Sequence, residues 1–441
     1  MEKMYQYLWR TAALGRDFHL TDGRMLHLVN PGNQNFDAGP DFSNARIRVD
    51  GMQWAGNVEI HLRASDWYHH GHDRNPVYDQ VMLHVVGVND RSVTRKDGSM
   101  MPTLVFNVPE EAQRLYVSLT SPVAEKIRCA ASISKIPRLT LEDWLESLAL
   151  ERIQEKATRI LDENDNLRGD WEQTCFVTLA RGLGFGLNGV PFEILARSLP
   201  LKFIRRHSDN LFQIEALLFG QAGMLDSSCR IFDDYYQQLC REYYFLARKY
   251  SLKPMQTSVW KFARTRPQNF PHRRIAFLCK ALEGGFPLMG SLLDADTPEQ
   301  TLSLFGWRLS GFWKDRFSFD TPASRTTDRL SQTSVYSLAI NVAAPLMYAY
   351  AARHGNESPA LRALRLLELL PPEKNTLTRD FETLGLCAAN AMRSQALIQL
   401  HKRYCDEGRC LDCRFSNRMI AAVAHESAGI YTVVSENEEW L

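Results

Sequence analysis

The pattern of apolar and polar positions changes about a quarter of the way along the chain. Before residue 110, apolar and polar residues alternate, most clearly over 45–49 and 54–62. A side-chain period of two is typical of strands with one buried face. The two runs flank Asp50-Gly51, a pair that favours a two-residue hairpin turn. We therefore predict antiparallel strands near 44–49 and 53–63, with Trp54, Val58 and Ile60 buried.

Two further runs extend this predicted sheet. Residues 81–88, VMLHVVGV, are nearly all apolar, which is typical of a central strand covered on both faces. Residues 103–108, TLVFNV, supply a candidate fourth strand.

After about residue 112 the apolar residues recur with the period of a helix. The clearest case is 141–161, where Leu145, Leu148 and Ile153 belong to one apolar stripe that follows Thr140. Similar patterns recur at 172–182, 190–198, 210–225, 230–250, 334–352, 358–370 and 386–404. The sequence therefore predicts an α+β fold, with a mixed β-sheet domain at 1–110 and a large all-helical domain at 111–441.

Composition narrows the class of protein. The 441 residues are 45% hydrophobic and 23% charged, as in ordinary globular proteins, and the net charge is +1. No global field marks a nucleic-acid or membrane partner, so any basic surface must be local. The N-terminus lacks the apolar segment of a secretory signal, and no window reaches the roughly 18 apolar residues of a membrane span. We expect a cytoplasmic protein with no membrane partner.

Polar residues of one chemical kind crowd the first domain. An irregular loop rich in Asn, Gly and Pro ends at Asp41, and Glu59 and His61 are two apart, hence on one face of the predicted second strand. Five of the 12 histidines fall between residues 61 and 84, among them His72 and His84. Paired carboxylates with imidazoles are the donors that divalent ions need. A metal site is the prediction, against the alternatives of a solvated Glu–His pair and a hydrogen-bonded core histidine at His84.

A second candidate metal site lies near the C-terminus. Cys405, Cys410 and Cys413 form a C-x4-C-x2-C pattern directly after a predicted helix, with His401 or Cys387 as a fourth donor. Three thiolates and one more donor suit zinc, and equally an iron–sulfur cluster. Ordinary reduced thiols are the alternative. The cysteines at 129, 175, 229, 240 and 279 are interpreted as small core residues.

Two stretches concentrate positive charge, at 202–207 and 264–274. Their arginines could meet phosphates, and Phe262 and Phe270 could stack on bases. Solvated helix faces are the alternative interpretation.

Longer segments resemble a known family. The stretch AGPDFSNARIRVDGMQWAGNVEIHLRASDWYHHGHDRNPVYDQVMLHVV is similar to the signature of an uncharacterised bacterial family, domain of unknown function 2851. The resemblance extends to QIEALLFGQAGML (213–225), RPQNFPHRRIA (266–276) and SQALIQLHKRYCDEGRCLDC (394–413). It implies membership over nearly the whole chain and brings no established activity.

A remoter resemblance concerns residues 40–61. Pro40-Asp41 before one strand, and Glu59-Ile60-His61 on the next, are similar to the PD-(D/E)xK nuclease superfamily. That likeness implies Asp41 and Glu59 as metal ligands, with His61 in place of the usual lysine. The hairpin register raises an objection, because it sets Asp41 opposite Ile60 and on the wrong face for Glu59. A bulge near Phe42-Ser43 would be required to bring Asp41 round.

These observations lead to a hypothesis of function. We expect a nuclease-like phosphodiesterase on nucleic acid that uses Mg or Mn, with Asp41, Glu59 and His61 catalytic and with His72 and His84 as further metal candidates. The alternatives are a non-catalytic nucleic-acid or protein adaptor, which mutually distant side chains would favour, and a metal hydrolase of a small molecule, which a closed apolar pocket would favour. Motifs of P-loop, Rossmann, α/β-hydrolase and zincin enzymes do not occur.

Overall fold

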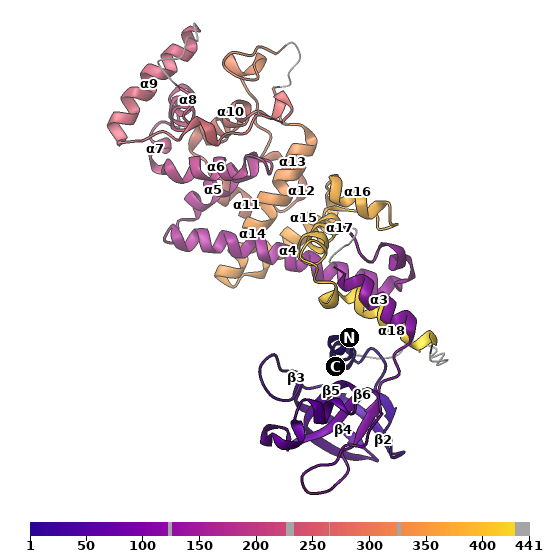
Figure 1. Cartoon of the computed structure of the whole chain (residues 1–441). Coiled ribbons are helices and arrows are strands. Elements are labelled where there is room, and N and C mark those ends of the chain that lie inside the picture. The colour runs from indigo at the N-terminus through magenta and orange to yellow at the C-terminus, as the bar shows by residue number, and fades with distance from the viewer. Residues whose placement is uncertain (122–125, 226–232, 264, 324–327, 428–441) are drawn as a thin grey trace. The chain divides into compact units, whose positions relative to one another are not determined.

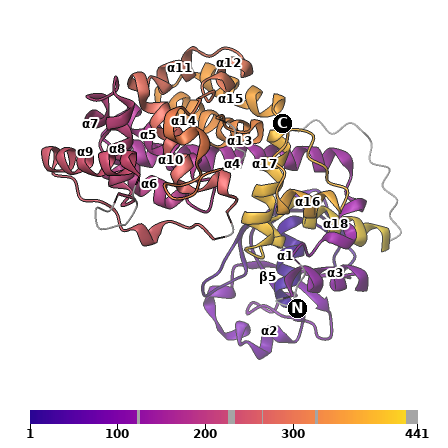
Figure 2. The ribbon, with the colours of Figure 1, turned by 90° about the horizontal axis from the view of Figure 1, so that it is seen from above.

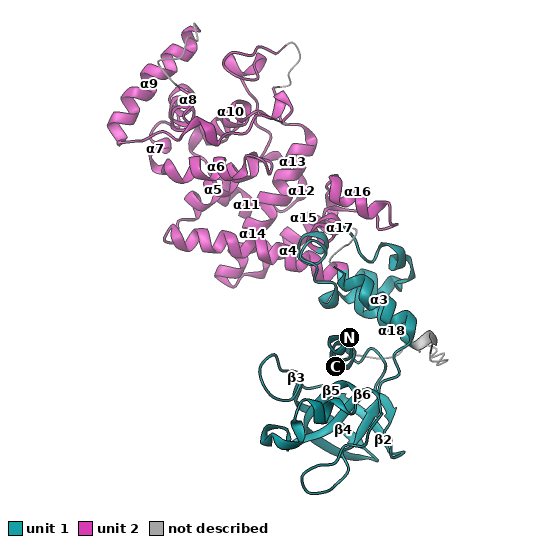
Figure 3. Cartoon of the chain, in the orientation of Figure 1, with its two compact units in different colours: residues 1–144, 400–441 teal, residues 145–399 magenta. Residues whose placement is uncertain are grey.

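The computed structural model describes residues 1–121, 126–225, 233–263, 265–323 and 328–427. The chain forms two compact units, with residues 1–144 and 400–441 in unit 1 and residues 145–399 in unit 2 (Figure 3). The mixed sheet and the largely helical remainder have the α+β composition that the sequence predicts. The units divide the chain at 144 and 399 instead of at 110, because the segment from residue 400 onward belongs to unit 1 with the sheet.

A seven-stranded mixed sheet forms the centre of unit 1 (Figure 1). The strand order is β1-β2-β4-β5-β6-β7, and β3 pairs with β4 alone. Pairing is antiparallel from β1 to β5 and parallel for β5–β6 and β6–β7. The strands are β1 (Asp17–His19), β2 (Met25–Asn30), β3 (Asn33–Gln34), β4 (Phe42–Val49), β5 (Met52–Arg63), β6 (Val81–Val88) and β7 (Thr103–Val105).

The hairpin β4–β5 has the predicted turn and register. Asp50 and Gly51 both have positive φ, at 45° and 82°, as a type I′ turn requires. Ile47 pairs with Trp54. Of the residues expected in the core, Val58 and Ile60 are fully buried, whereas Trp54 is only half-buried. The strand prediction is confirmed.

A β-bulge interrupts β4 at the point where the predicted register raised its objection. Ala45 pairs with Gly56 in the regular register, but Phe42 pairs with Val58, one residue out of step. The extra residue is accommodated where Asn44 takes a left-handed conformation, with φ 56°. Because a shift of one residue exchanges the faces of a strand, the chain before the bulge enters on the opposite face.

Two different sets of side chains cover the faces of the sheet. Helix α1 (Glu2–Thr11) contributes Met4, Leu8 and Trp9 to the larger core, which also contains Val58 and Ile60. The other face of β5 and β6 is covered by the crossover between them. That crossover comprises α2 (Asp66–His69) and the 3-10 helices η1 (His72–Arg74) and η2 (Pro76–Tyr78), and its Trp67 and Tyr78 form a second buried cluster. Glu59 and His61 are therefore enclosed, not solvated.

Helical segments from residues 110–135 and 401–427 complete unit 1. Helices α3 and α18 pack together, and α18 also contacts η3 and η10. Their bounds are α3 (Glu110–Thr120), η3 (Ala130–Lys135), η9 (His401–Cys405, a π-helix), η10 (Cys410–Asp412) and α18 (Arg414–Ser427).

Unit 2 is helical throughout its described residues, apart from isolated bridges, and has its own apolar core. Helix α4 (Arg138–Asn166) begins in unit 1 and continues here, and α14 lies beside α15 (Figures 1 and 2). The other α-helices are α5 (Trp171–Leu183), α6 (Gly189–Ser198), α7 (Leu201–Arg205), α8 (Leu211–Gln221), α9 (Asp234–Tyr250), α10 (Pro271–Leu282), α11 (Leu288–Asp294), α12 (Pro298–Ser303), α13 (Gln332–Leu338), α14 (Ala344–His354), α15 (Glu357–Leu369), α16 (Thr376–Glu382) and α17 (Ala391–Leu400). Short 3-10 helices are η4 (Thr257–Val259), η5 (Pro267–Asn269), η6 (Glu283–Gly285) and η7 (Gly311–Asp315), and η8 (Ala339–Ala343) is a π-helix.

The basic stretch at 264–274 does not present its cations as predicted. Arg273 and Arg274 are buried, and Arg273 donates to the carbonyl oxygens of Trp313 and Arg316. Phe262 packs against the apolar core. Burial of Arg273 and Arg274 contradicts both interpretations of this stretch, the phosphate contacts and the solvated helix face. Arg264 lies outside the described residues.

One helical run, Gln332–His354, is apolar and long enough to cross a membrane, and 67% of its most apolar window is buried inside the protein. The bent pair Pro271–Gly285 and Leu288–Asp294 passes the same test only when taken as one span. Burial of this extent is what a core helix of a helical unit shows.

Candidate metal centre

Asp41 and Glu59 lie directly against one another on the enclosed side of the sheet. The Asp41 backbone N–H donates to Glu59 Oε2 at 3.0 Å, and the Ile60 N–H donates to Asp41 Oδ2 at 3.0 Å. Gln6 of α1 donates its amide to Asp41 Oδ1 at 2.8 Å. The bulge in β4 makes this meeting possible, because it turns Asp41 to the face that carries Glu59.

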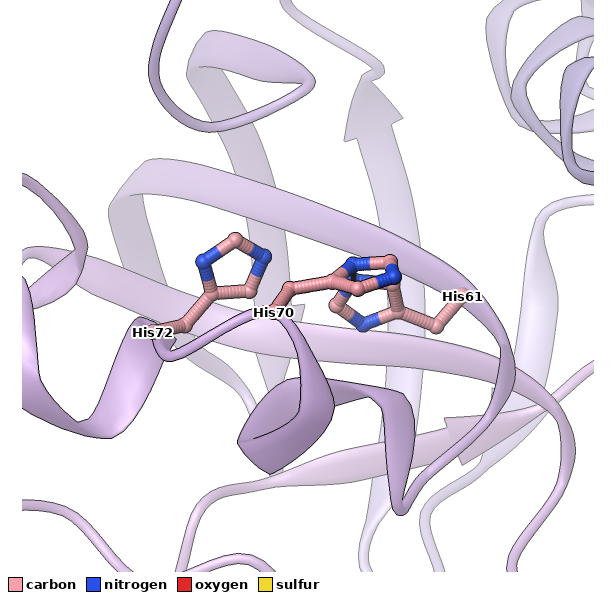
Figure 4. A group of neighbouring side chains, drawn as sticks. All are labelled: His61, His70 and His72. Atoms are coloured by element: carbon pink, nitrogen blue, oxygen red, sulfur yellow. Dashed lines mark hydrogen bonds between the residues drawn. The ribbon is translucent and has the colours of Figure 1, made fainter.

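Three imidazoles converge beside this carboxylate pair. One ring nitrogen from each of His61, His70 and His72 lies within 4.8 Å of those of the other two (Figure 4). His61 comes from β5, His70 from the end of α2 and His72 from the start of η1. His61 Nε2 is 3.2 Å from His70 Nδ1. Glu59 Oε1 is 3.5 Å from His61 Nε2 and 3.2 Å from His72 Nε2.

His84 stands behind this group. Its Nε2 is 2.8 Å from His61 Nδ1, and among the described residues its own Nδ1 has no hydrogen-bond partner. When His61 donates from Nδ1 to His84, the lone pair of His61 Nε2 points toward Glu59 Oε1 and His70. A metal-binding histidine usually donates its other N–H in this way, which fixes its tautomer and orientation. His84 therefore fits a positioning role better than the predicted role of direct ligand.

Burial controls the charge of these groups. It raises the pKa of Asp41 to about 7, and the carboxylate of Glu59 adds to that rise. Burial also lowers the pKa of His61 to about 2, with the neighbouring histidines contributing, and lowers the pKa of His84 to about 4. His61 and His84 are thus neutral at neutral pH, and neutral imidazole is the form that binds a metal ion.

The printed separations between neighbouring donors match those around one ion, and the ligand nitrogens of the three histidines all lie within 4.8 Å of one another. Bonds of about 2.0–2.1 Å to nitrogen or oxygen place neighbouring tetrahedral ligand atoms about 3.3 Å apart. The three separations that link Glu59 Oε1, His61 Nε2, His70 Nδ1 and His72 Nε2 are 3.2–3.5 Å. In the tautomer that donates from Nδ1 to His84, the lone pair of His61 Nε2 faces the Glu59 carboxylate, an arrangement that a cation between them would stabilise. The donor set therefore fits a divalent ion, and three imidazoles favour manganese or zinc over magnesium.

The centre is enclosed on most sides but reaches the surface. Glu59 and His61 are buried, whereas His70 is exposed. A pocket of about 230 Å³ opens beside His72, with Trp67 and Tyr78 in its wall. Its other lining residues are mostly charged, with Asp73, Asp79, Asp97, Arg95 and Lys96 among them.

Sequence reasoning missed two members of this site. His70 was one of the clustered histidines, but it could not be told from His69 without knowing where α2 ends. Gln6 comes from a helix whose packing over the site no local pattern reveals. The density of histidines and the Glu-x-His spacing were the signals that could be used, and the structure brings all five predicted N-terminal residues, Asp41, Glu59, His61, His72 and His84, into one cluster.

The C-terminal cysteines have a different arrangement. Among the described residues, no three cysteine sulfurs lie within 4.8 Å of one another. The expected convergence of Cys405, Cys410 and Cys413 to the roughly 4 Å that a single zinc ion needs is therefore not found. Cys387 is exposed in unit 2, and His401 Nδ1 is 3.1 Å from Asp406 Oδ1. Cys405 ends η9, whereas Cys410 and Cys413 lie at the two ends of η10.

Comparison with known proteins identifies a family for this chain but no activity. No curated protein matches the chain, and no solved structure matches it. One family, described as "Protein of unknown function (DUF2851)", matches residues 2–376. That match spans the whole sheet, the histidine cluster and most of the helical unit, and the chain belongs to this family.

Proposed function

We propose that unit 1 is a divalent-metal-dependent phosphodiesterase that acts on nucleic acid. The proposal rests on the convergence of Asp41, Glu59 and His61 with His70 and His72. An uninterrupted hairpin register would place Asp41 on the strand face opposite to that of Glu59. The bulge in β4 brings Asp41 to the same face as Glu59. The adaptor alternative expected these side chains to be far apart, and they are in contact.

The chemistry follows from the donor set. A divalent ion bound by Glu59 and the imidazoles would lower the pKa of a bound water and neutralise charge that builds up on a phosphate. Both ring nitrogens of His61 face other imidazoles, so His61 serves as a ligand and not as a free base. Asp41, held by Gln6 and by the Ile60 amide, orients Glu59 and can supply a further oxygen ligand.

Two arginines favour a polyanionic substrate over a small molecule. Arg46 and Arg48 are exposed on β4, and neither forms an ion pair with a described residue. Arg46 pairs with Ala55, which shares a strand face with Glu59 four residues later, roughly 13 Å along β5. Cations at that distance suit the neighbouring phosphates of a bound strand. The pocket beside His72 is open and largely charged, unlike the closed apolar pocket that a small-molecule hydrolase would favour.

The test is a cleavage assay on single- and double-stranded DNA and RNA. We expect cleavage with manganese that is abolished by chelator and weaker with magnesium. Replacing Arg46 and Arg48 together by alanine should raise KM and reduce its salt dependence while leaving kcat within about twofold, because the arginines bind phosphates away from the ion. Arg114→Ala, on the exposed face of α3, is the control.

Cleavage that persists in chelator, or a KM that is unchanged in the double variant, would contradict the proposal. Cleavage of small phosphodiesters with no cleavage of any polynucleotide would favour the small-molecule alternative.

A further inference from the structure

Four cysteines of unit 1 lie near one another, although Cys129 is some 280 residues from the other three in sequence. Cys129 immediately precedes η3, Cys405 ends η9, Cys410 begins η10 and Cys413 follows it. Helix α18 contacts both η3 and η10, and η10 contacts η9. Cys410 and Cys129 also pack into the same apolar core as the sheet. Cys129, interpreted from sequence as a core residue, thus joins the three C-terminal cysteines.

Arg128 links the segment before η3 to the segment that carries the other three cysteines. Its guanidinium would lie 3.4 Å from a side-chain carbon added at Gly408, so it reaches across the turn between Cys405 and Cys410. The same guanidinium hydrogen-bonds the sulfur of Cys410 and the carbonyl of Leu119. The residue next to Cys129 is therefore in contact with the segment that carries the other three cysteines.

The environment of the sulfurs suits bound thiolates. Cys413 Sγ accepts backbone hydrogen bonds from Phe415 and Ser416, at the start of α18. Such N–H donors stabilise negative charge on sulfur. Cys410 and Cys413 are buried, and Cys129 and Cys405 are half-buried, so the four thiols are largely shielded from water.

We propose that Cys129, Cys405, Cys410 and Cys413 bind an iron–sulfur cluster. The spacing distinguishes it from a zinc ion. A single zinc requires sulfurs roughly 4 Å apart, and no three of these are within 4.8 Å. In a four-iron cluster each cysteine binds a separate iron, so the sulfurs stand further apart. The cluster would join the segment after α3 to the C-terminal segment and hold α18 against the rest of unit 1.

The experiment measures iron and acid-labile sulfide in full-length protein that is purified anaerobically and reconstituted with ferrous iron and sulfide. The wild type should hold about four irons per chain, with visible absorbance that bleaches on reduction. Cys129→Ser should lose most of the iron. Cys387→Ser and His401→Ala change the donors that the sequence suggested, and they should retain it.

A variant of the other site separates this inference from the proposed phosphodiesterase. Glu59→Gln combined with His72→Ala should keep the cluster, because those residues belong to the N-terminal centre. Circular dichroism of Cys129→Ser reports on folding, and Cys240→Ser provides a cysteine control from unit 2. Zinc in place of iron, no metal after reconstitution, or full iron content in Cys129→Ser would overturn the inference.

Discussion

Glu59→Gln should reduce metal-dependent cleavage by about 10²–10³-fold, the range seen when one electrostatic element of an active site is removed. Glutamine has the shape of glutamate and keeps an oxygen to accept from the Asp41 amide, but it lacks the charge that faces His61 and His72. Manganese affinity, measured by calorimetry, should fall in parallel. The free energy of unfolding of the metal-free protein should change by no more than about 1 kcal/mol.

Glu111→Gln is the matched control, because Glu111 is exposed on α3 in the same unit. It should leave both cleavage and metal affinity as in the wild type. Equal cleavage by wild type and Glu59→Gln would mean that the activity comes from another site or from a contaminant.

Gly32→Ala should disrupt the bulge and thereby the metal centre. Gly32 has φ 88°, and an added Cβ would lie 2.5 Å from the Ser43 carbonyl oxygen and 2.8 Å from the Ala45 nitrogen. Both are backbone atoms of the bulge, so neither can move away without a large cost in free energy. Positive φ and overpacking together should lower the free energy of unfolding by about 2–5 kcal/mol. Asp41 should lose its place opposite Glu59, and manganese affinity should fall.

Gly23→Ala separates the two contributions. Gly23 has φ 90° and no atom within 4 Å of an added Cβ, so it carries the conformational strain without the collision. It should cost only about 1–2 kcal/mol and leave manganese affinity unchanged. Denaturant unfolding and calorimetry on both variants provide the comparison. A Gly32→Ala protein with wild-type manganese affinity would show that the bulge does not set the position of Asp41.

Local patterns were sufficient for the sheet. The alternation on both sides of Asp50-Gly51 predicted β4, β5 and their turn, because side-chain period and turn chemistry are properties of neighbouring residues. The same regularity produced the register objection. An alternating pattern contains no sign of an extra residue, and the close approach of Gly32 that accompanies the bulge comes from another part of the chain.

Long-range packing accounts for what the sequence could not supply. His70 joins the site because α2 ends where it does, and Cys129 lies near Cys410 although some 280 residues of chain separate them. Arg273 and Arg274 look like surface cations in sequence, yet they are buried with carbonyl and side-chain partners. Residue type indicates which chemistry is available, whereas these pairings depend on the tertiary fold.

The most direct test of the metal centre is a crystal structure of the protein with manganese, with anomalous scattering used to locate the ion. We expect one strong anomalous peak in contact with Glu59, His61 and His72, with His70 or Asp41 completing the ligands. Each bond should be about 2.0–2.2 Å long. A peak elsewhere, or none at saturating manganese while Glu59 and His72 keep their direct 3.2 Å contact, would contradict this expectation.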